Sequence, residues 1–154
     1  MTGARRGLLL RAWWLAAIPI LVGVALPVMA ESEASYLTGA VVGDAVRGQE
    51  VVLDRATGNC VICHRVPVAG VAFQGDLGPD LAGIGDRLTA GQIRFRLVDQ
   101  SRLNPSTLMP PYYRTDGLTR VAERFRGRPA LSAQQIEDVV AWLVTLKAGV
   151  GDPK

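Results

Sequence analysis

The sequence has few of the residues that catalytic and metal sites most often use. Its 154 residues include one histidine and two cysteines, so a four-ligand zinc site would need carboxylates as well. After residue 30 there is one methionine and one tryptophan. Three of the 17 basic residues precede residue 30, which leaves 14 against the 14 acidic residues that all follow it. This balance gives no argument for a nucleic-acid partner.

The first thirty residues contain no acidic side chain and have the pattern of an export signal. Two arginines precede an apolar run that ends at Ala30, a small residue that suits signal peptidase. An uncleaved membrane anchor is the alternative, because residues 12–29 carry no charge and are long enough to span a bilayer. Pro19 and Pro27 interrupt the run, which favours cleavage. We predict a signal peptide over 1–30 and a periplasmic protein, with membrane attachment only if the signal is uncleaved.

The rest of the chain lacks internal repeats and any alternating apolar stretch long enough for a sheet. With 49% hydrophobic residues over 154 positions, the chain has the composition of one globular domain. Residues 31–43 are small and polar without periodicity, and we interpret them as an N-terminal tail able to pack on a partner. We place the domain at 44–150 and predict an all-α fold.

Helix-capping patterns predict three helices in this domain. Asp44 is placed to cap a short helix that runs to about residue 55. Thr89 and Ser132 each precede a glutamine by three positions, which is the capping-box pattern and predicts helices that reach about residues 100 and 147. The last helix has apolar residues on one face, and Gly149 follows it as a stop signal.

Long loops separate these helices. Glycines and prolines between residues 65 and 87 predict irregular structure, and a later loop holds Pro105, Pro110 and Pro111. Three or four short helices with this much loop bury too little apolar surface to form a stable core alone. The domain therefore needs another component to fill its core, and the cysteines indicate which one.

Cys60-Val61-Ile62-Cys63-His64 has the Cys-x-x-Cys-His pattern that attaches c-type haem. Cys60 and Cys63 would fix the porphyrin edge by two thioethers, which places the imidazole of His64 under the iron as an axial ligand. A thioredoxin-like redox pair would need a strand before the motif, and none is predicted there. Zinc lacks ligands here, and a plain disulfide would close a very short loop and leave His64 without a role. We predict one covalent haem c.

Met109 is the candidate for the second axial ligand. Both cysteines are used for attachment and His64 is the only histidine, so bis-histidine and thiolate ligation from this chain are excluded. A thioether sulfur favours reduced iron, raises the reduction potential and suits electron transfer. The alternatives are a core-filling Met109 beside a five-coordinate iron that binds small gases, or ligation by Lys147 or Lys154. The proline-flanked loop around Met109 favours ligation.

With these residues identified, the chain resembles the class I cytochromes c over nearly all of 44–150. The resemblance is carried by Gly48 in the first helix, the attachment motif, the Gly78-Pro79-Asp80-Leu81 stretch, the Met109-Pro110 loop and the amphipathic last helix. It implies that the Pro79 carbonyl accepts a hydrogen bond from the His64 imidazole. It also implies that the first and last helices cross near the haem edge, where Gly48 meets Trp142. Simple core burial is the alternative reason for Trp142.

A closer resemblance is to the SoxX family, the monohaem subunits of the SoxAX sulfur-oxidation complex. It is carried by three stretches, residues 77–81, 104–113 and 128–140. The resemblance implies a periplasmic heterodimer with a SoxA-like haem subunit, which joins thiosulfate to a cysteine of a SoxYZ-like carrier. The chemical centre of this L-cysteine S-thiosulfotransferase reaction would lie on the partner, in keeping with the lack of a free cysteine in this chain.

We therefore predict outer-sphere transfer of electrons from the partner subunit through this haem to a soluble acceptor, with no catalytic residue on this chain. A free-standing electron carrier and a haem-based gas sensor are the competing interpretations. One arginine-rich segment is placed to meet haem propionates or an acidic partner, or else to form a solvated face balanced by Asp116 and Glu123. Its members are Arg114, Arg120, Arg124, Arg126 and Arg128.

Overall fold

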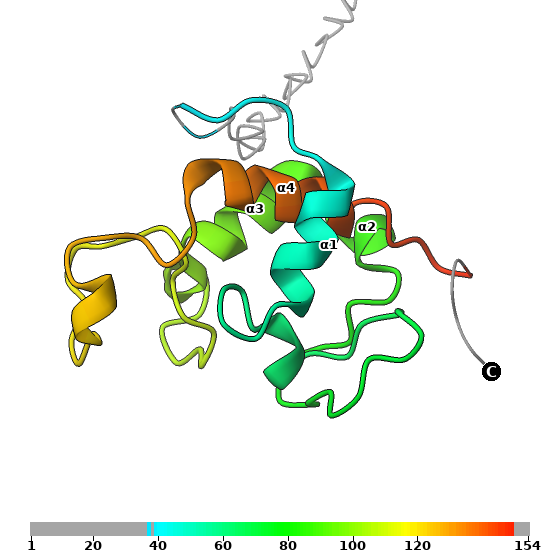
Figure 1. Ribbon diagram of the computed structural model, residues 1–154, viewed down its shortest axis with the longest axis horizontal. Helices are drawn as coiled ribbons and strands as arrows, with labels where there is room; N and C mark the ends of the chain where they lie inside the picture. The colour runs from blue at the N-terminus through cyan, green and yellow to red at the C-terminus, as the bar shows by residue number, and fades with distance from the viewer. Residues whose placement is uncertain (1–36, 38, 150–154) are drawn as a thin grey trace, which may run out of the picture.

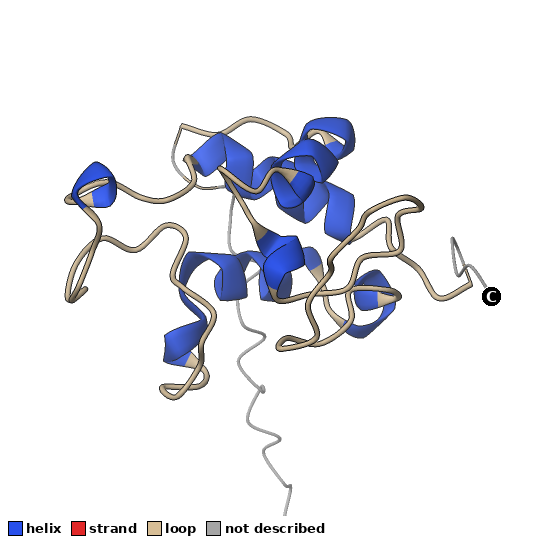
Figure 2. Ribbon diagram, turned by 60° about the horizontal axis from the view of Figure 1, so that its bottom comes forward, coloured by secondary structure: helices blue, strands red, loops and turns tan. Residues whose placement is uncertain are grey.

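The computed structural model describes residue 37 and residues 39–149 of the chain. Helix is the only regular structure in this part of the chain (Figures 1 and 2), so the expected all-α class is confirmed. In chain order the elements are α1 (Ala45–Leu53), the 3₁₀ helix η1 (Cys60–Ile62), α2 (Ile84–Arg87), α3 (Ala90–Asp99), the 3₁₀ helices η2 (Gln100–Arg102) and η3 (Glu123–Phe125), and α4 (Ala133–Leu143). Within the described residues, no helix has the length and apolarity needed to cross a membrane. The predicted signal peptide lies outside these residues.

The three predicted helix starts are confirmed by their caps. The Asp44 carboxylate accepts hydrogen bonds from the backbone N–H groups of Val46 and Arg47, at 2.9 and 3.0 Å. At α3 and α4 the hydroxyls of Thr89 and Ser132 accept from the third residue of the helix, and the glutamine at that position bonds back to the cap residue. These bonds satisfy N–H groups that have no partner inside the helix.

Two helices are shorter than the sequence predicts. α1 stops before residue 55, because Asp54 adopts an extended conformation and its carboxylate accepts a hydrogen bond from the Ala56 N–H at 2.8 Å. α4 stops before residue 147, where the hydroxyl of Thr145 donates to the Trp142 carbonyl at 2.6 Å and the backbone continues in tighter turns. In both cases a short polar side chain competes for the backbone groups that a longer helix would use.

The prediction that residues 65–87 are wholly irregular is wrong at their end, where α2 forms one short helix. Gly83, in the left-handed region at φ +66°, starts this helix. The Arg87 guanidinium then donates to the carbonyls of Asp80 and Ala82, at 2.7 and 2.6 Å. Sequence patterns favoured loop here because glycine and proline are frequent and the helix is too short to show periodicity.

The first and last helices cross, and glycine makes the crossing possible. α1 and α3 both pack against α4 (Figure 1). A Cβ atom at Gly48 would lie 1.9 Å from the Asp138 carbonyl oxygen and 3.0 Å from the Trp142 Cβ. Only glycine therefore permits this backbone separation. The contact between Gly48 and Trp142 is the one that the cytochrome c resemblance implied.

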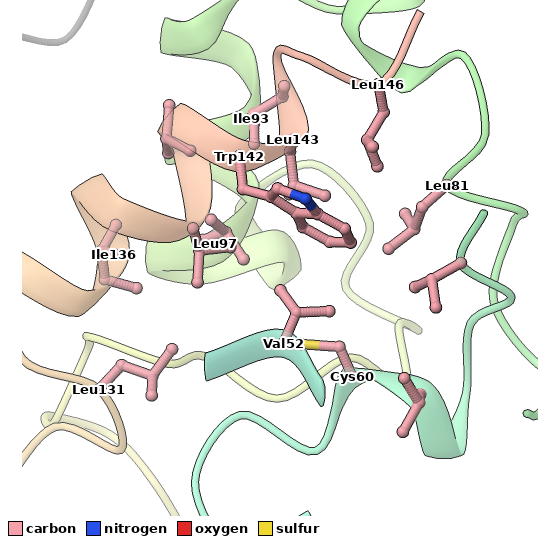
Figure 3. Packing of buried hydrophobic residues seen from close by; sticks show 14 residues of the cluster. Val52, Cys60, Leu81, Ile93, Leu97, Leu131, Ile136, Trp142, Leu143 and Leu146 are labelled. Carbon is pink, nitrogen blue, oxygen red and sulfur yellow. The ribbon is translucent and has the colours of Figure 1, made fainter. Parts of the chain in front are cut away.

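One apolar cluster lies among the helices, and loops complete it (Figure 3). Helix residues supply most of it, while Cys60, Leu81 and Leu131 come from η1 and the loops. Its buried members are Val52, Cys60, Val61, Val66, Leu81, Ile93, Leu97, Leu131, Ile136, Val139, Val140, Trp142, Leu143 and Leu146. Residues 115–130, yellow to orange in Figure 1, form an arm that projects from this core.

The described part of the predicted tail packs on α4 of the same chain. The Leu37 N–H donates to the Glu137 carboxylate at 3.2 Å, and the Val41 N–H donates to the Gln134 side chain at 2.9 Å. A Cβ atom at Gly43 would meet the Glu137 carbonyl oxygen at 2.1 Å. Residues 37 and 39–43 thus follow the last helix closely. Residues 31–36 and 38 lie outside the described part.

Candidate functional site

The two cysteines lie on one tight turn. Asn59 precedes it in the left-handed conformation at φ 50°, which asparagine tolerates better than most residues. η1 then carries Cys60 to Ile62, and the N–H groups of Cys63 and His64 both bond to the Cys60 carbonyl, at 3.1 and 3.0 Å. Both thiols are free. The backbone therefore presents two unpaired thiols and the following imidazole from one compact segment.

Burial makes the Cys60 thiol a poor nucleophile. The residue is 9% exposed, and its burial raises the pKa of the thiol to about 11. A catalytic dithiol needs a thiolate, and therefore a cysteine whose pKa is lowered. This environment gives the thioredoxin-like alternative no support. The described residues also contain no group of three or more His, Cys, Asp or Glu side chains placed to hold a metal ion.

The His64 imidazole is held from one side by the Gly78-Pro79 segment. Its Nδ1 lies 2.7 Å from the Pro79 carbonyl oxygen, and the Gly78 N–H donates to the Cys63 carbonyl at 2.7 Å. A Cβ atom at Gly78 would lie 2.4 Å from His64 Cε1, so a side chain there would displace the ring. With Nδ1 as the donor to Pro79, Nε2 is left as the ring nitrogen with a free lone pair.

Met109 is half-buried in the loop that connects α3 to the arm, and it packs against the apolar cluster. Its N–H donates to the Thr107 hydroxyl at 3.1 Å. Three residues further on, the Tyr112 N–H bonds to the Leu97 carbonyl and its hydroxyl donates to the Gly58 carbonyl, both at 3.0 Å. Tyr112 therefore joins the Met109 loop to the turn that precedes Cys60.

These residues fit a large flat apolar group attached through the two thiols. Val52, Cys60, Leu81 and Trp142 turn toward a common space in Figure 3, and Met109 packs on the same cluster. The donor set of one imidazole, one thioether and two free thiols matches haem c. The Asn59 side-chain oxygen beside the motif is buried without a hydrogen-bond partner in the described chain, as expected next to a component that the chain alone does not supply.

Three buried carboxylates pair with arginines that the sequence did not indicate as their partners. Arg94 bonds to Glu137 with both of its contacting nitrogens at 2.7 Å, which ties α3 to α4. Arg47 holds Asp138, and Arg114 holds Asp99, with closest distances of 2.9 and 2.7 Å. The partners are 43, 91 and 15 residues apart, so no local sequence spacing predicts these pairs. A charged residue at an apolar position of a helix face, such as Glu137, is the one available signal.

At two of these carboxylates, hydrogen bonds lower the pKa by more than burial raises it. Burial alone would raise the pKa of Asp138, but bonds from Arg47, the Asp44 N–H and Gln134 hold the pKa below its usual range. In the same way, bonds from Ser101 and Arg114 outweigh the burial of Asp99 and lower its pKa. Both groups are therefore carboxylates at neutral pH, and their arginine partners neutralise them.

The arginines of the segment from Arg114 to Arg128 have different kinds of contact. Arg126 forms an ion pair with Glu123 at 2.9 Å, and the Arg124 guanidinium lies 4.7 Å from the ring centre of Phe125. Arg114 instead reaches back to Asp99 in the body of the domain. The balance by Glu123 is thus observed for one arginine, while Arg114 has a separate contact that the sequence did not predict.

Three large apolar side chains next to the motif are exposed, and we call Ile62, Phe73 and Leu77 the apolar patch. They are 58%, 92% and 70% exposed. The Gly75 N–H bonds to the Val61 carbonyl at 2.9 Å, which holds this loop beside η1. Phe73 has a left-handed backbone at φ 55°, an unfavourable conformation for an aromatic residue. The Arg55 guanidinium stabilises it by donating to the carbonyls of Ala72 and Phe73, at 2.9 and 3.2 Å.

Comparison with known proteins identifies a family model and a solved structure that this chain is similar to. The family model described as cytochrome c matches residues 45–147. A chain of the crystal structure of SoxXA from P. pantotrophus is 40% identical in sequence, with a TM-score of 0.67, and the match covers 73% of this chain and 88% of that one. No curated protein matches the chain.

Proposed function

Because the chain belongs to the cytochrome c family and is a SoxX-like electron-transfer cytochrome with one covalent haem c, we propose that it is an exported subunit of a thiosulfate-oxidising complex. Cys60 and Cys63 would attach the haem, and His64 and Met109 would supply the two side-chain ligands of its iron. The observation that carries this assignment is the contact of 2.7 Å between His64 Nδ1 and the Pro79 carbonyl oxygen, directly beside the two free thiols.

When bound, the haem supplies a one-electron redox centre. The chain's own residues set its environment. His64 donates its Nδ1 proton to Pro79, which fixes the tautomer and makes Nε2 a more basic ligand. Met109 would offer a neutral sulfur from the loop that follows α3, and such a ligand favours the reduced state. The apolar cluster limits the access of water to the site, and the resulting low dielectric constant contributes to the reduction potential. No residue of this chain needs to move a proton.

The apolar patch favours a permanent subunit over a freely diffusing carrier. Carriers make small transient contacts, whereas permanent partners bury large and comparatively apolar surfaces. Ile62 stands between the two attachment cysteines, and Phe73 and Leu77 lie on the adjoining loop. A partner that covers these three side chains would place its own redox group near the attachment site. We assign this place to a SoxA-like haem subunit, because the relative at 40% identity comes from a SoxXA structure.

The division of chemistry between the subunits follows from the cysteine count. Both cysteines of this chain serve haem attachment, so the sulfur chemistry belongs to the partner. That partner would join thiosulfate to a cysteine of a SoxYZ-like carrier, and this subunit would take up the released electrons and pass them to a soluble acceptor. The chain is then part of an L-cysteine S-thiosulfotransferase complex without carrying a catalytic residue.

Native purification from the source organism tests this function. We expect the haem band to co-purify with a second haem subunit, and its reduction by thiosulfate to require both that subunit and a carrier protein. A monomeric protein that unrelated redox partners reduce equally well, with no thiosulfate dependence in any reconstitution, would favour the free-standing carrier instead.

Substitution of the attachment residues tests the site independently of the partner. Cys60→Ala or Cys63→Ala should lower the yield of haem-stained protein after denaturing electrophoresis, and His64→Ala should lower it further. Met109→Ala should abolish the iron–sulfur charge-transfer absorption and lower the reduction potential. An unchanged ferric spectrum in Met109→Ala would show that Met109 only fills the core. The sixth position would then be held by a lysine or be open.

A further inference from the structure

Both ends of the loop that carries Met109 converge on one buried carboxylate. We call residues 103–113 the Met109 loop. Asp99, at the end of α3, is 3% exposed. Its Oδ1 accepts from the N–H and the hydroxyl of Ser101, at 3.1 and 2.6 Å, just before the loop begins. Its Oδ2 accepts from Arg114 Nε at 2.7 Å, just after the loop ends.

Backbone bonds add to this closure at the exit of the loop. The Tyr112 N–H bonds to the Leu97 carbonyl at 3.0 Å, and the Arg114 N–H bonds to the Val98 carbonyl at 3.4 Å. Between the two ends the bonding is local. The hydrogen bonds described for residues 104–110 all join residues within 100–109, including that of the Met109 N–H to Thr107. Apart from its packing on the apolar cluster, the position of Met109 therefore depends on how its loop is closed.

We propose that Asp99 is a positioning residue that keeps Met109 at the haem iron by holding the entry and the exit of its loop together. The inference rests on the proposed role of Met109 as axial ligand. A ligand on a closed loop is always near its site, while opening the loop enlarges the space that the ligand explores. Removal of the Asp99 charge thus raises the fraction of molecules in which Met109 has left the sixth position.

An external ligand measures that fraction. Imidazole binds only to molecules in which Met109 is displaced. Its apparent association constant is therefore its intrinsic association constant multiplied by the fraction of open molecules. Asp99→Asn keeps an oxygen for Ser101 but brings an amide N–H group toward Arg114, where two donors face each other. A hydrogen bond to a charged group is lost. We expect imidazole to bind the ferric Asp99→Asn holoprotein about tenfold more tightly than the wild type.

Asp138 provides a matched control for a purely structural effect. It is a buried aspartate of comparable exposure, 2% against 3%, and its arginine partner, Arg47, lies at 2.9 Å. This pair joins α1 to α4, and neither residue lies on the Met109 loop. Asp138→Asn should lower thermal stability but leave the affinity for imidazole and the iron–sulfur absorption unchanged. Equal changes in both aspartate variants would assign the effect to global stability and overturn the proposal.

The experiment compares five ferric holoproteins by imidazole titration, charge-transfer absorption and reduction potential. They are the wild type, Asp99→Asn, Arg114→Gln, Asp138→Asn and Met109→Ala. Arg114→Gln removes the exit contact from a residue that is 25% exposed, and it tests the same closure if Asp99→Asn fails to fold.

We expect tighter imidazole binding, weaker absorption and a lower potential in both loop variants. If the loop variants bind imidazole as the wild type does while Met109→Ala binds it more tightly, the role of Asp99 is overturned but Met109 ligation is not. An unchanged affinity in Met109→Ala would overturn Met109 ligation and this inference with it.

Discussion

Gly78 contributes to the site by having no side chain. The His64 ring occupies the space that a Cβ atom at this position would take, at 2.4 Å from Cε1. Pro79, the next residue, then presents its carbonyl to His64 Nδ1. The motif alone is the basis for proposing His64 as a ligand, but the orientation of its ring depends on this adjoining pair.

The first prediction concerns this pair. Gly78→Ala should displace the His64 ring and weaken its bond to Pro79, because the added methyl group overlaps ring atoms. We expect a lower yield of haem-bound protein, and an altered potential in the fraction that matures. Leu77→Ala changes the preceding residue, which is 70% exposed, and should retain wild-type yield and potential. Equal values for Gly78→Ala and the wild type would show that the ring does not depend on this contact.

At the scale of elements, α4 organises the domain. α1 crosses it at Gly48, α3 is tied to it by Arg94 and Glu137, and the described part of the tail follows its surface. Most of these contacts join residues far apart in sequence. Rigid placement of α4 therefore requires both the beginning and the middle of the domain.

The helix crossing gives a second prediction. Gly48→Ala should destabilise the holoprotein by about 1–3 kcal/mol or more, because the added methyl group overlaps the α4 backbone at Asp138. Alanine favours helix by about 1 kcal/mol over glycine, so a net loss must come from the crossing. Glu50→Ala, at an exposed position of α1, is the control and should change the free energy of unfolding little. Denaturant titration of both variants measures the free energy of unfolding, and equal values for Gly48→Ala and the wild type would contradict this prediction.

The third prediction is an acid dependence of stability. The pKa of Asp138 in the folded domain lies below its usual value because its hydrogen bonds outweigh burial. A lowered folded pKa stabilises the domain above the unfolded value of about 3.9, and that stabilisation is lost as the pH falls through the folded pKa. Asp138→Asn should therefore melt below the wild type at pH 7, and the difference should shrink toward pH 2. A constant difference between pH 7 and pH 2 would contradict this sign.

Local signals were sufficient for helix starts and for the haem motif, and insufficient for long-range pairs. Asp44, Thr89 and Ser132 predicted their caps because capping involves neighbours within three residues. Arg47 and Asp138 are 91 residues apart, and nothing near either residue indicates the other. α2 was missed because one helical turn after Gly83 has no measurable period. The role of Pro79 came from resemblance, and physical reasoning on the sequence alone does not reach it.

At the scale of the whole molecule, the apolar patch places three of the eight exposed large apolar side chains of the described chain at or next to the haem motif. Phe73 is 92% exposed on a left-handed backbone that Arg55 supports. A protein that functions alone gains nothing from holding an aromatic ring in solvent in this conformation. The patch therefore agrees with a molecule that is complete only with a second subunit.

The fourth prediction tests this reading of the surface. Phe73→Ser should weaken binding to the partner haem subunit by about tenfold or more, because exposed aromatic residues commonly anchor interfaces. The haem spectrum and melting temperature of the free subunit should stay close to those of the wild type. Val46→Ser is the control, since Val46 is 69% exposed on α1 outside the patch. Co-elution and titration of the two subunits measure the effect, and equal weakening by both variants would assign no special role to the patch.

The crossing of α1 and α4 also sets an order of events in time. α1 has its packing surface only after α4 has been synthesised, because Gly48 fits against Asp138 and Trp142 near the end of the domain. In a chain exported as we propose, Cys60 and Cys63 emerge well before the helix that completes their surroundings. The buried Cys60 thiol is thus accessible to the attachment machinery during translocation and is enclosed once the last helix arrives. We expect a chain truncated before Ser132 to accept haem yet remain sensitive to protease, so that attachment precedes closure of the fold.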